Sequence, residues 1–109
     1  MKIKNRVNDN DVDNTLESKG FDANGGEIFY YQGQPFNGFI ESYYENGNLR
    51  DEVEYSEGSI GGVIREYYEN GVTKSEYFQY FNKYKGISRE WNEDGKLISK
   101  FDWDKKENI

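Results

Sequence analysis

The sequence lacks two residue types that dominate enzyme chemistry, because its 109 residues include no cysteine and no histidine. Without them the chain cannot form disulfides, thiol nucleophiles or cysteine and imidazole zinc sites, and it lacks the usual general base near neutral pH. Long apolar runs are missing too, so no window approaches a membrane span and no signal-peptide core follows the N-terminus. We therefore expect a soluble, cytoplasmic protein that is not an enzyme and needs no cofactor or metal.

Positive charge is scarce, with 14 basic against 21 acidic residues and a net charge of -7. The excess of negative charge is concentrated in residues 38–70, which contain eight acidic residues and two basic ones. Nucleic acid and anionic lipid are bound by basic surfaces, so the distribution argues against both as partners. If the chain has a partner, we expect a basic protein.

What the sequence does have is aromatic residues. Apolar residues make up 34% of the chain, and half of that share is aromatic, with 10 Tyr, 7 Phe and 2 Trp. Burial must therefore come from large rings, and the length suits one domain. We expect residues 1–20 to form a polar, partly disordered leader and residues 21–109 to form the folded domain.

A 24-residue internal repeat organises the folded part. It gives three copies, about 38–61, 62–85 and 86–109, after a partial copy at 27–37. The repeat is marked by two sets of glycines, which are Gly38, Gly62 and Gly86 and, nine residues later, Gly47, Gly71 and Gly95.

Each copy has the pattern of a β-hairpin. A stretch of aromatic and β-branched residues is followed by Asn-Gly or Asp-Gly, as at Asn46-Gly47, and then by a return strand such as 49–55. The sequence therefore predicts an all-β fold, an antiparallel meander of repeated hairpins in a single curled sheet. Such a sheet buries one face poorly by itself, so we expect the leader to cover part of it through its apolar residues, Ile3, Val7, Val12, Leu16 and Phe21.

The register of the hairpins depends on the turn. A two-residue turn pairs Tyr44 with Leu49, whereas a three-residue turn with a glycine bulge pairs Tyr43 with Leu49. We favour the bulged turn, with the column of Tyr43 and its equivalents as core. It predicts one apolar face, made of Phe39, Tyr43, Leu49, Val53, Tyr55, Val63, Tyr67, Tyr77, Ile87, Trp91, Leu97, Phe101 and Trp103. The other face then carries Glu52, Glu54, Glu76 and Lys100.

Acidic residues and exposed tyrosines form the candidate partner-binding surface. Carboxylates would attract a basic protein, and one tyrosine of each Tyr-Tyr pair would be free to anchor it. An ordinary solvated strand face would have the same composition, and its charges would discourage edge pairing. The candidate residues are Glu41, Tyr44, Glu45, Asp51, Glu52, Glu54, Glu57, Glu66, Tyr68 and Glu69.

Two other chemistries have weak support. Asp9, Asp11 and Asp13 have the spacing that begins a calcium loop, but Asn14 and Gly20 stand where the loop needs glycine and a bidentate glutamate. Carboxylate pairs such as Glu41 with Glu45 could serve a glycosidase, yet so acidic a chain contains such pairs by chance. We expect neither a metal site nor a catalytic site.

The motif YYENG at 43–47 and 67–71, with QPFNG at 34–38, resembles the MORN-type repeat variant of bacterial antitoxins, the YwqK-like family. The resemblance covers residues 27–103. It departs at Asn82, which stands where the previous copy has Gly58, and at Trp91-Asn92, which replaces the Tyr-Tyr pair.

This resemblance implies an antitoxin or immunity protein that neutralises a cognate bacterial toxin, such as a basic nuclease or the toxic domain of a contact-dependent growth inhibition system. The alternative is a structural or scaffolding repeat module whose acidity maintains solubility. Either protein would be a monomer or a dimer formed through an edge strand.

Overall fold

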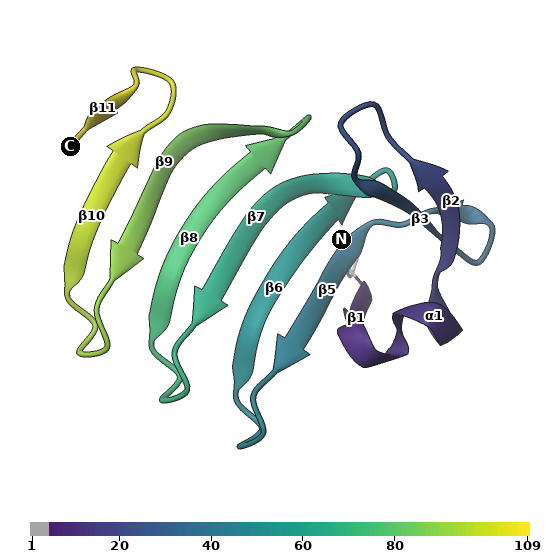
Figure 1. Cartoon of the computed structure of the whole chain (residues 1–109), viewed down its shortest axis with the longest axis horizontal. Coiled ribbons are helices and arrows are strands. Elements are labelled where there is room, and N and C mark those ends of the chain that lie inside the picture. The colour runs from purple at the N-terminus through teal and green to yellow at the C-terminus, as the bar shows by residue number, and fades with distance from the viewer. Residues whose placement is uncertain (1–4) are drawn as a thin grey trace.

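The computed structural model describes residues 5–109 and confirms the all-β class. Most strands form one sheet of eight, whose central six run as an antiparallel meander (Figure 1). In spatial order its strands are β1 (Asn5–Asn8), β5 (Gly38–Tyr43), β6 (Leu49–Ser56), β7 (Ser59–Tyr67), β8 (Thr73–Tyr80), β9 (Lys83–Trp91), β10 (Leu97–Asp102) and β11 (Glu107–Asn108).

The partial first copy does not extend this meander, so the expectation of a single sheet is wrong. Strand β1 lies parallel to β5, with Asn5 opposite Gly38 and Asn8 opposite Glu41, and it occupies the edge that a preceding hairpin would have used. The chain therefore forms a second, three-stranded sheet beside the first. Its strands are β2 (Glu17–Phe21), β3 (Glu27–Tyr31) and β4 (Gln34–Pro35).

The N-terminal segment forms secondary structure within its described part, which begins at residue 5. After β1, the 3-10 helix η1 (Asp9–Asp11) and the one-turn helix α1 (Val12–Thr15) lead into β2. As expected, this segment covers part of the large sheet, although Phe21 is 70% exposed and takes no part. Ile3 lies outside the described residues. The core consists of buried Val7, Leu16, Phe29 and Phe36, against which Val12, Tyr31, Ile40 and Tyr55 pack.

The hairpin turns are the bulged type that the sequence predicts. Gly47 donates its N–H to the carbonyl of Tyr44, Tyr44 donates to the carbonyl of Asn48, and Tyr43 pairs with Leu49. Gly47 has φ of +91°, which glycine adopts without a steric penalty. The same hydrogen bonds recur in the next two hairpins.

A second irregularity directly after the turn changes which residues share a face. Ser42 pairs with Asp51 although Tyr43 pairs with Leu49, so Arg50 is an extra residue that bulges out of β6. The shift recurs one and two repeats later, at Lys74 and at Ile98. Each bulge moves the rest of its return strand to the opposite face from the one expected.

The expected separation into an apolar and a charged face is therefore wrong. On one face of the sheet, apolar Phe39 and Val63 lie beside acidic Glu52 and Glu76. We call this face the ladder face. We call the other the core face, because its Ile40 and Tyr55 pack on the N-terminal core. Tyr43 is 41% exposed, so its column is not a continuous core. A second aromatic cluster on the core face consists of Tyr77, Tyr84, Phe101 and Trp103.

Within residues 5–109, no helix is long and apolar enough to cross a membrane.

Candidate functional site

The second tyrosine of each Tyr-Tyr pair joins one repeat to the next. The hydroxyl of Tyr44 donates to the carbonyl oxygen of Tyr67 at 2.6 Å, and that of Tyr68 donates to the carbonyl oxygen of Trp91 at 2.8 Å. Both rings are half-buried. Tyr44 and Tyr68 are thus structural residues whose hydroxyls are already bonded within the chain, which corrects the prediction that they are free to anchor a partner.

The asparagine of the same motif holds adjacent turns together. Asn46 donates its side-chain amide to the carbonyl of Glu69 at 3.0 Å, and Asn70 donates to that of Glu93 at 3.1 Å. These bonds align the three hairpin turns along one end of the sheet (Figure 1). The side chains of Glu45 and Glu69 remain exposed there.

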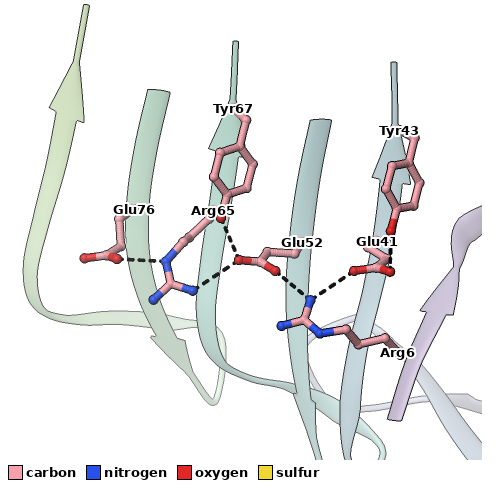
Figure 2. Close-up of polar contacts among 7 residues, drawn as sticks. All are labelled: Arg6, Glu41, Tyr43, Glu52, Arg65, Tyr67 and Glu76. Carbon is pink, nitrogen blue, oxygen red and sulfur yellow. Dashed lines mark hydrogen bonds and ion pairs between the residues drawn. The ribbon is translucent and has the colours of Figure 1, made fainter. Parts of the chain in front are cut away.

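A row of ionic groups, which we call the charged ladder, crosses the ladder face (Figure 2). Arg6 on β1 bonds both Glu41, at 2.9 Å, and Glu52, at 2.8 Å. Arg65 on β7 continues the row by bonding Glu52 at 3.1 Å and Glu76 at 2.8 Å. Glu41 and Glu52 lie directly opposite one another, so the arginine between them offsets a repulsion that the pairing would otherwise carry.

Glu52 is the centre of the charged ladder and is 4% exposed. Besides the two arginines, the hydroxyl of Tyr67 donates to it at 2.8 Å. Burial opposes ionisation, but the bonds from Arg6, Tyr67 and Arg65 outweigh it and hold the pKa of Glu52 below its ordinary value. The burial of Tyr67 itself and its hydrogen bond to Glu52 raise the pKa of Tyr67 to about 12.

Three predicted interface carboxylates are therefore engaged within the fold. Glu52 and Glu41 belong to the charged ladder, where Glu41 also accepts from the hydroxyl of Tyr43 at 2.6 Å. Glu54 accepts from the backbone N–H of Val63 at 3.1 Å. Glu52 is buried, so its prediction as an interface residue is wrong. The bulge at Arg50 places Glu52 on the ladder face, where the two arginines enclose it.

A second row of carboxylates crosses the core face near the hairpin turns. We call Asp51, Glu66 and Glu90 the acidic row. Asp51 lies directly opposite Glu66, and Ser75 lies between Glu66 and Glu90. Glu66 accepts from the hydroxyl of Ser75, at 3.1 Å, and Glu90 from that of Tyr77, at 2.9 Å.

The acidic row is not neutralised in the way the charged ladder is. Glu66 and Glu90 are exposed and form no ion pair with any residue in 5–109, while Asp51 has Arg50 at 3.5 Å. Like charges directly opposite on a sheet are unfavourable. The row is therefore a concentration of negative charge that a cationic ligand would stabilise.

The structure gathers most of the remaining predicted residues around this row. Glu45 and Glu69 lie at the turns next to it, and Asp51 and Glu66 belong to it. Glu57 does not join them, because it lies in the β6–β7 turn at the opposite end of the strands.

Sequence reasoning missed Glu90 and Glu93, which belong to the same end of the sheet. Glu90 and Glu93 follow Glu66 and Glu69 by 24 residues, which is the length of the repeat. The 24-residue repeat could therefore have predicted that they lie at this end of the sheet. Their segment has a slight excess of basic residues, which concealed the local acidity.

The residues of the two weakly supported chemistries lie as follows. No group of three or more metal-ligating side chains gathers within residues 5–109. Asp9, Asp11 and Asp13 lie in η1 and α1, where Asp9 approaches Arg50 at 3.8 Å. Glu41 is bound in the charged ladder, whereas Glu45 stands apart at the turn.

Comparison of the chain with protein-family models, with curated proteins and with solved structures returned no match. The likeness to the MORN-type antitoxin repeat therefore stays a prediction from the motifs.

Proposed function

We propose that the chain is an antitoxin or immunity protein that binds and neutralises a basic bacterial toxin. The observation that supports this function best is the acidic row, in which Asp51 faces Glu66 and the two exposed glutamates have no cationic partner in residues 5–109. In the charged ladder the same fold pairs its carboxylates with arginines. The contrast between the two faces favours a binding role for the row over a purely structural one.

Electrostatics gives this surface a mechanism. Carboxylates clustered at one end of the sheet steer a basic partner and raise its association rate. They can also occupy the site at which a nuclease binds the phosphate groups of its substrate. A basic nuclease, including the toxic domain of a contact-dependent growth inhibition system, is the partner that suits them best. The proposal includes action in the cytoplasm, no catalytic activity, and no binding of nucleic acid or membranes.

A capture experiment tests this function. The chain is used as bait in an extract of its native cell, the beads are washed at low and then high salt, and retained proteins are identified by mass spectrometry. We expect one basic protein whose expression alone stops growth and whose toxicity co-expression of this chain relieves. Recovery of no such protein, or of captured proteins without toxicity, would contradict the proposal.

A scaffolding role is the second candidate, and the edge of β10 favours it. Strand β11 pairs with Phe101 and Asp102, which leaves the edge at Leu97 and Ile98 without a neighbouring strand in the described chain. These two side chains are 49% and 61% exposed, and such an edge can add a strand from another molecule. Assembly that Ile98→Lys abolishes, in a chain that relieves no toxicity, would favour scaffolding over inhibition.

A further inference from the structure

A cavity lies at the end of the sheet away from the hairpin turns and the acidic row. Its volume is about 480 Å³, within the range of ligand-binding pockets. Three connections form it, namely the β2–β3 turn, the β6–β7 turn and the β8–β9 turn, which gather at the same end of the molecule (Figure 1). Ile60, Tyr80 and Phe81 supply its apolar lining.

The β8–β9 turn holds an aromatic residue in an unfavourable backbone conformation. Phe81 has φ of +51° and is followed by Asn82 with φ of +63°. The corresponding turn of the previous repeat consists of Glu57 and Gly58, and the glycine at its second position adopts positive φ without a steric penalty. Gln32 and Glu57 adopt nearly the same φ, +51° and +52°, so the positive φ belongs to this type of turn. The β8–β9 turn differs in having a bulky ring at that position and asparagine in place of the following glycine.

Packing does not account for this phenylalanine. Phe81 is 84% exposed, so its ring gains little from burial within the chain. Tyr80 beside it is 40% exposed, and its ring already has the ammonium group of Lys85 at 5.9 Å from its centroid. Both residues line the cavity, and aromatic rings suit a cation.

The charged side chains that line the cavity are acidic. Its lining includes two carboxylates, those of Asp22 and Glu57, and no lysine or arginine, although the ammonium group of Lys85 approaches the ring of Tyr80. Asp22 accepts from the backbone N–H groups of Asn24 and Gly26 at 2.9 and 3.0 Å through the same oxygen. These bonds hold the pKa of Asp22 below its ordinary value, so the group is ionised at neutral pH.

We propose that this cavity binds the arginine or lysine side chain of a protein partner, with the rings of Tyr80 and Phe81 beneath the cation and the carboxylate of Asp22 beside it. Aromatic rings and a carboxylate around one space are the combination that recognises guanidinium and ammonium groups. The site is separate from the acidic row, since it lies beyond the opposite ends of the strands. A partner that spans both would be held at two ends of the sheet.

Nuclear magnetic resonance titration with a short probe tests the site without any toxin. The probe is the capped peptide Gly-Arg-Gly at millimolar concentration, and the control is the same peptide with neutral citrulline in place of arginine. We expect the arginine peptide to produce saturable shifts of the backbone amides in residues 22–26, 56–61 and 79–82. Shifts that are absent, spread over the whole sheet, or equal for both peptides would overturn the proposal.

Two variants separate recognition from folding. Asp22→Asn keeps an oxygen that can accept from Asn24 and Gly26 but removes the charge, and Phe81→Gly relieves the turn but removes the ring. We expect roughly two- to five-fold weaker binding of the peptide by Phe81→Gly, with no fall in its denaturation midpoint. Phe21→Ser, which removes another exposed ring, should bind as the native chain does. Unchanged binding by Asp22→Asn and Phe81→Gly, or a lower midpoint in Phe81→Gly, would contradict the assignment.

Because the probe is a peptide, this test stands apart from the proposed inhibition. A chain that binds the peptide but rescues no toxin would keep the cation site and lose the antitoxin function. A chain that rescues a toxin but does not bind the peptide would show the reverse.

Discussion

The hydroxyl of Tyr44 donates a hydrogen bond of 2.6 Å to the backbone carbonyl oxygen of Tyr67 in the next repeat. One repeat later, Tyr68 makes the same bond to Trp91. The third copy has Asn92 at this position, and its side chain instead accepts from Asp94 and Lys96 in its own turn. The doubled tyrosine is thus a joint between copies, and it disappears in the copy whose turn has no following hairpin turn beside it in the described chain.

Removing either joint should lower stability. Tyr44→Phe and Tyr68→Phe each lose one hydrogen bond from a half-buried hydroxyl and leave a carbonyl without that donor, which costs about 1 kcal/mol. Urea unfolding followed by circular dichroism measures the change. Tyr80→Phe is the matched control, because its exposed hydroxyl has no hydrogen-bond partner in residues 5–109. Equal stability of all three variants would show that the joints contribute nothing.

Glu52 should be the most sensitive carboxylate of the sheet. Glu52→Gln removes the charge that Arg6 and Arg65 share, and we expect a loss of about 2 kcal/mol in the free energy of unfolding, typical of hydrogen bonds to charged groups. Glu107→Gln, an exposed change on β11, should alter it by less than about 0.5 kcal/mol. A similar effect of the two variants would contradict a structural role for the charged ladder.

Acid should weaken the native fold partly through the same residue. The folded protein holds the pKa of Glu52 below its ordinary value of 4.5, so Glu52 contributes stability above that pH. This contribution is lost as the pH falls through the lower, folded pKa. Unfolding measured between neutral pH and pH values below about 4 should show a flatter acid dependence for Glu52→Gln than for the native chain. Parallel curves would exclude the contribution.

Two tyrosines should ionise at an unusually high pH. Burial and carboxylate bonds raise the pKa values of Tyr67 and Tyr77 to about 12, from an ordinary value of 10.0. Because the folded values are the higher ones, the stability from these groups is full below pH 10 and is lost between 10 and 12. Titration of tyrosinate absorbance should show a late component that Tyr67→Phe reduces. A single transition at the ordinary value would refute the raised pKa values.

Much of the fold could be predicted from the repeat and its turns. The Asn-Gly signal at Asn46-Gly47 specifies a turn because glycine adopts positive φ, and the pairing of Tyr43 with Leu49 follows from that turn. The bulge at Arg50 could not be predicted, because a bulge adds one residue without any fixed residue type. Since side chains alternate between faces, the one extra residue in each return strand, at Arg50, Lys74 and Ile98, reversed the predicted face of the residues after it.

The site was harder to predict than the fold. Composition identified an acidic region, but pairing across strands decides which carboxylates are neutralised. Glu52 and Asp51 are neighbours in sequence, yet one is enclosed by two arginines and the other faces Glu66. Arg6, which completes the charged ladder, comes from a parallel strand far away in sequence, and no local pattern indicates such a contact.

Salt should affect partner binding in a specific way. If the acidic row steers a basic protein, raising the ionic strength slows association far more than it speeds dissociation. Surface plasmon resonance with the captured partner measures both rates. An association rate that does not change with salt would remove steering from the mechanism.

The measurement that tests the central claim most directly is toxin rescue by a chain whose acidic row is neutral. Asp51→Asn, Glu66→Gln and Glu90→Gln are combined in one variant, and Glu17→Gln, Glu27→Gln and Glu107→Gln form a control with the same change in net charge. We expect the control to capture the basic partner and to relieve its toxicity. The row variant, whose native fold is checked by circular dichroism, should neither capture the partner nor relieve the toxicity. Full rescue by the row variant would show that the acidic row is not the binding surface.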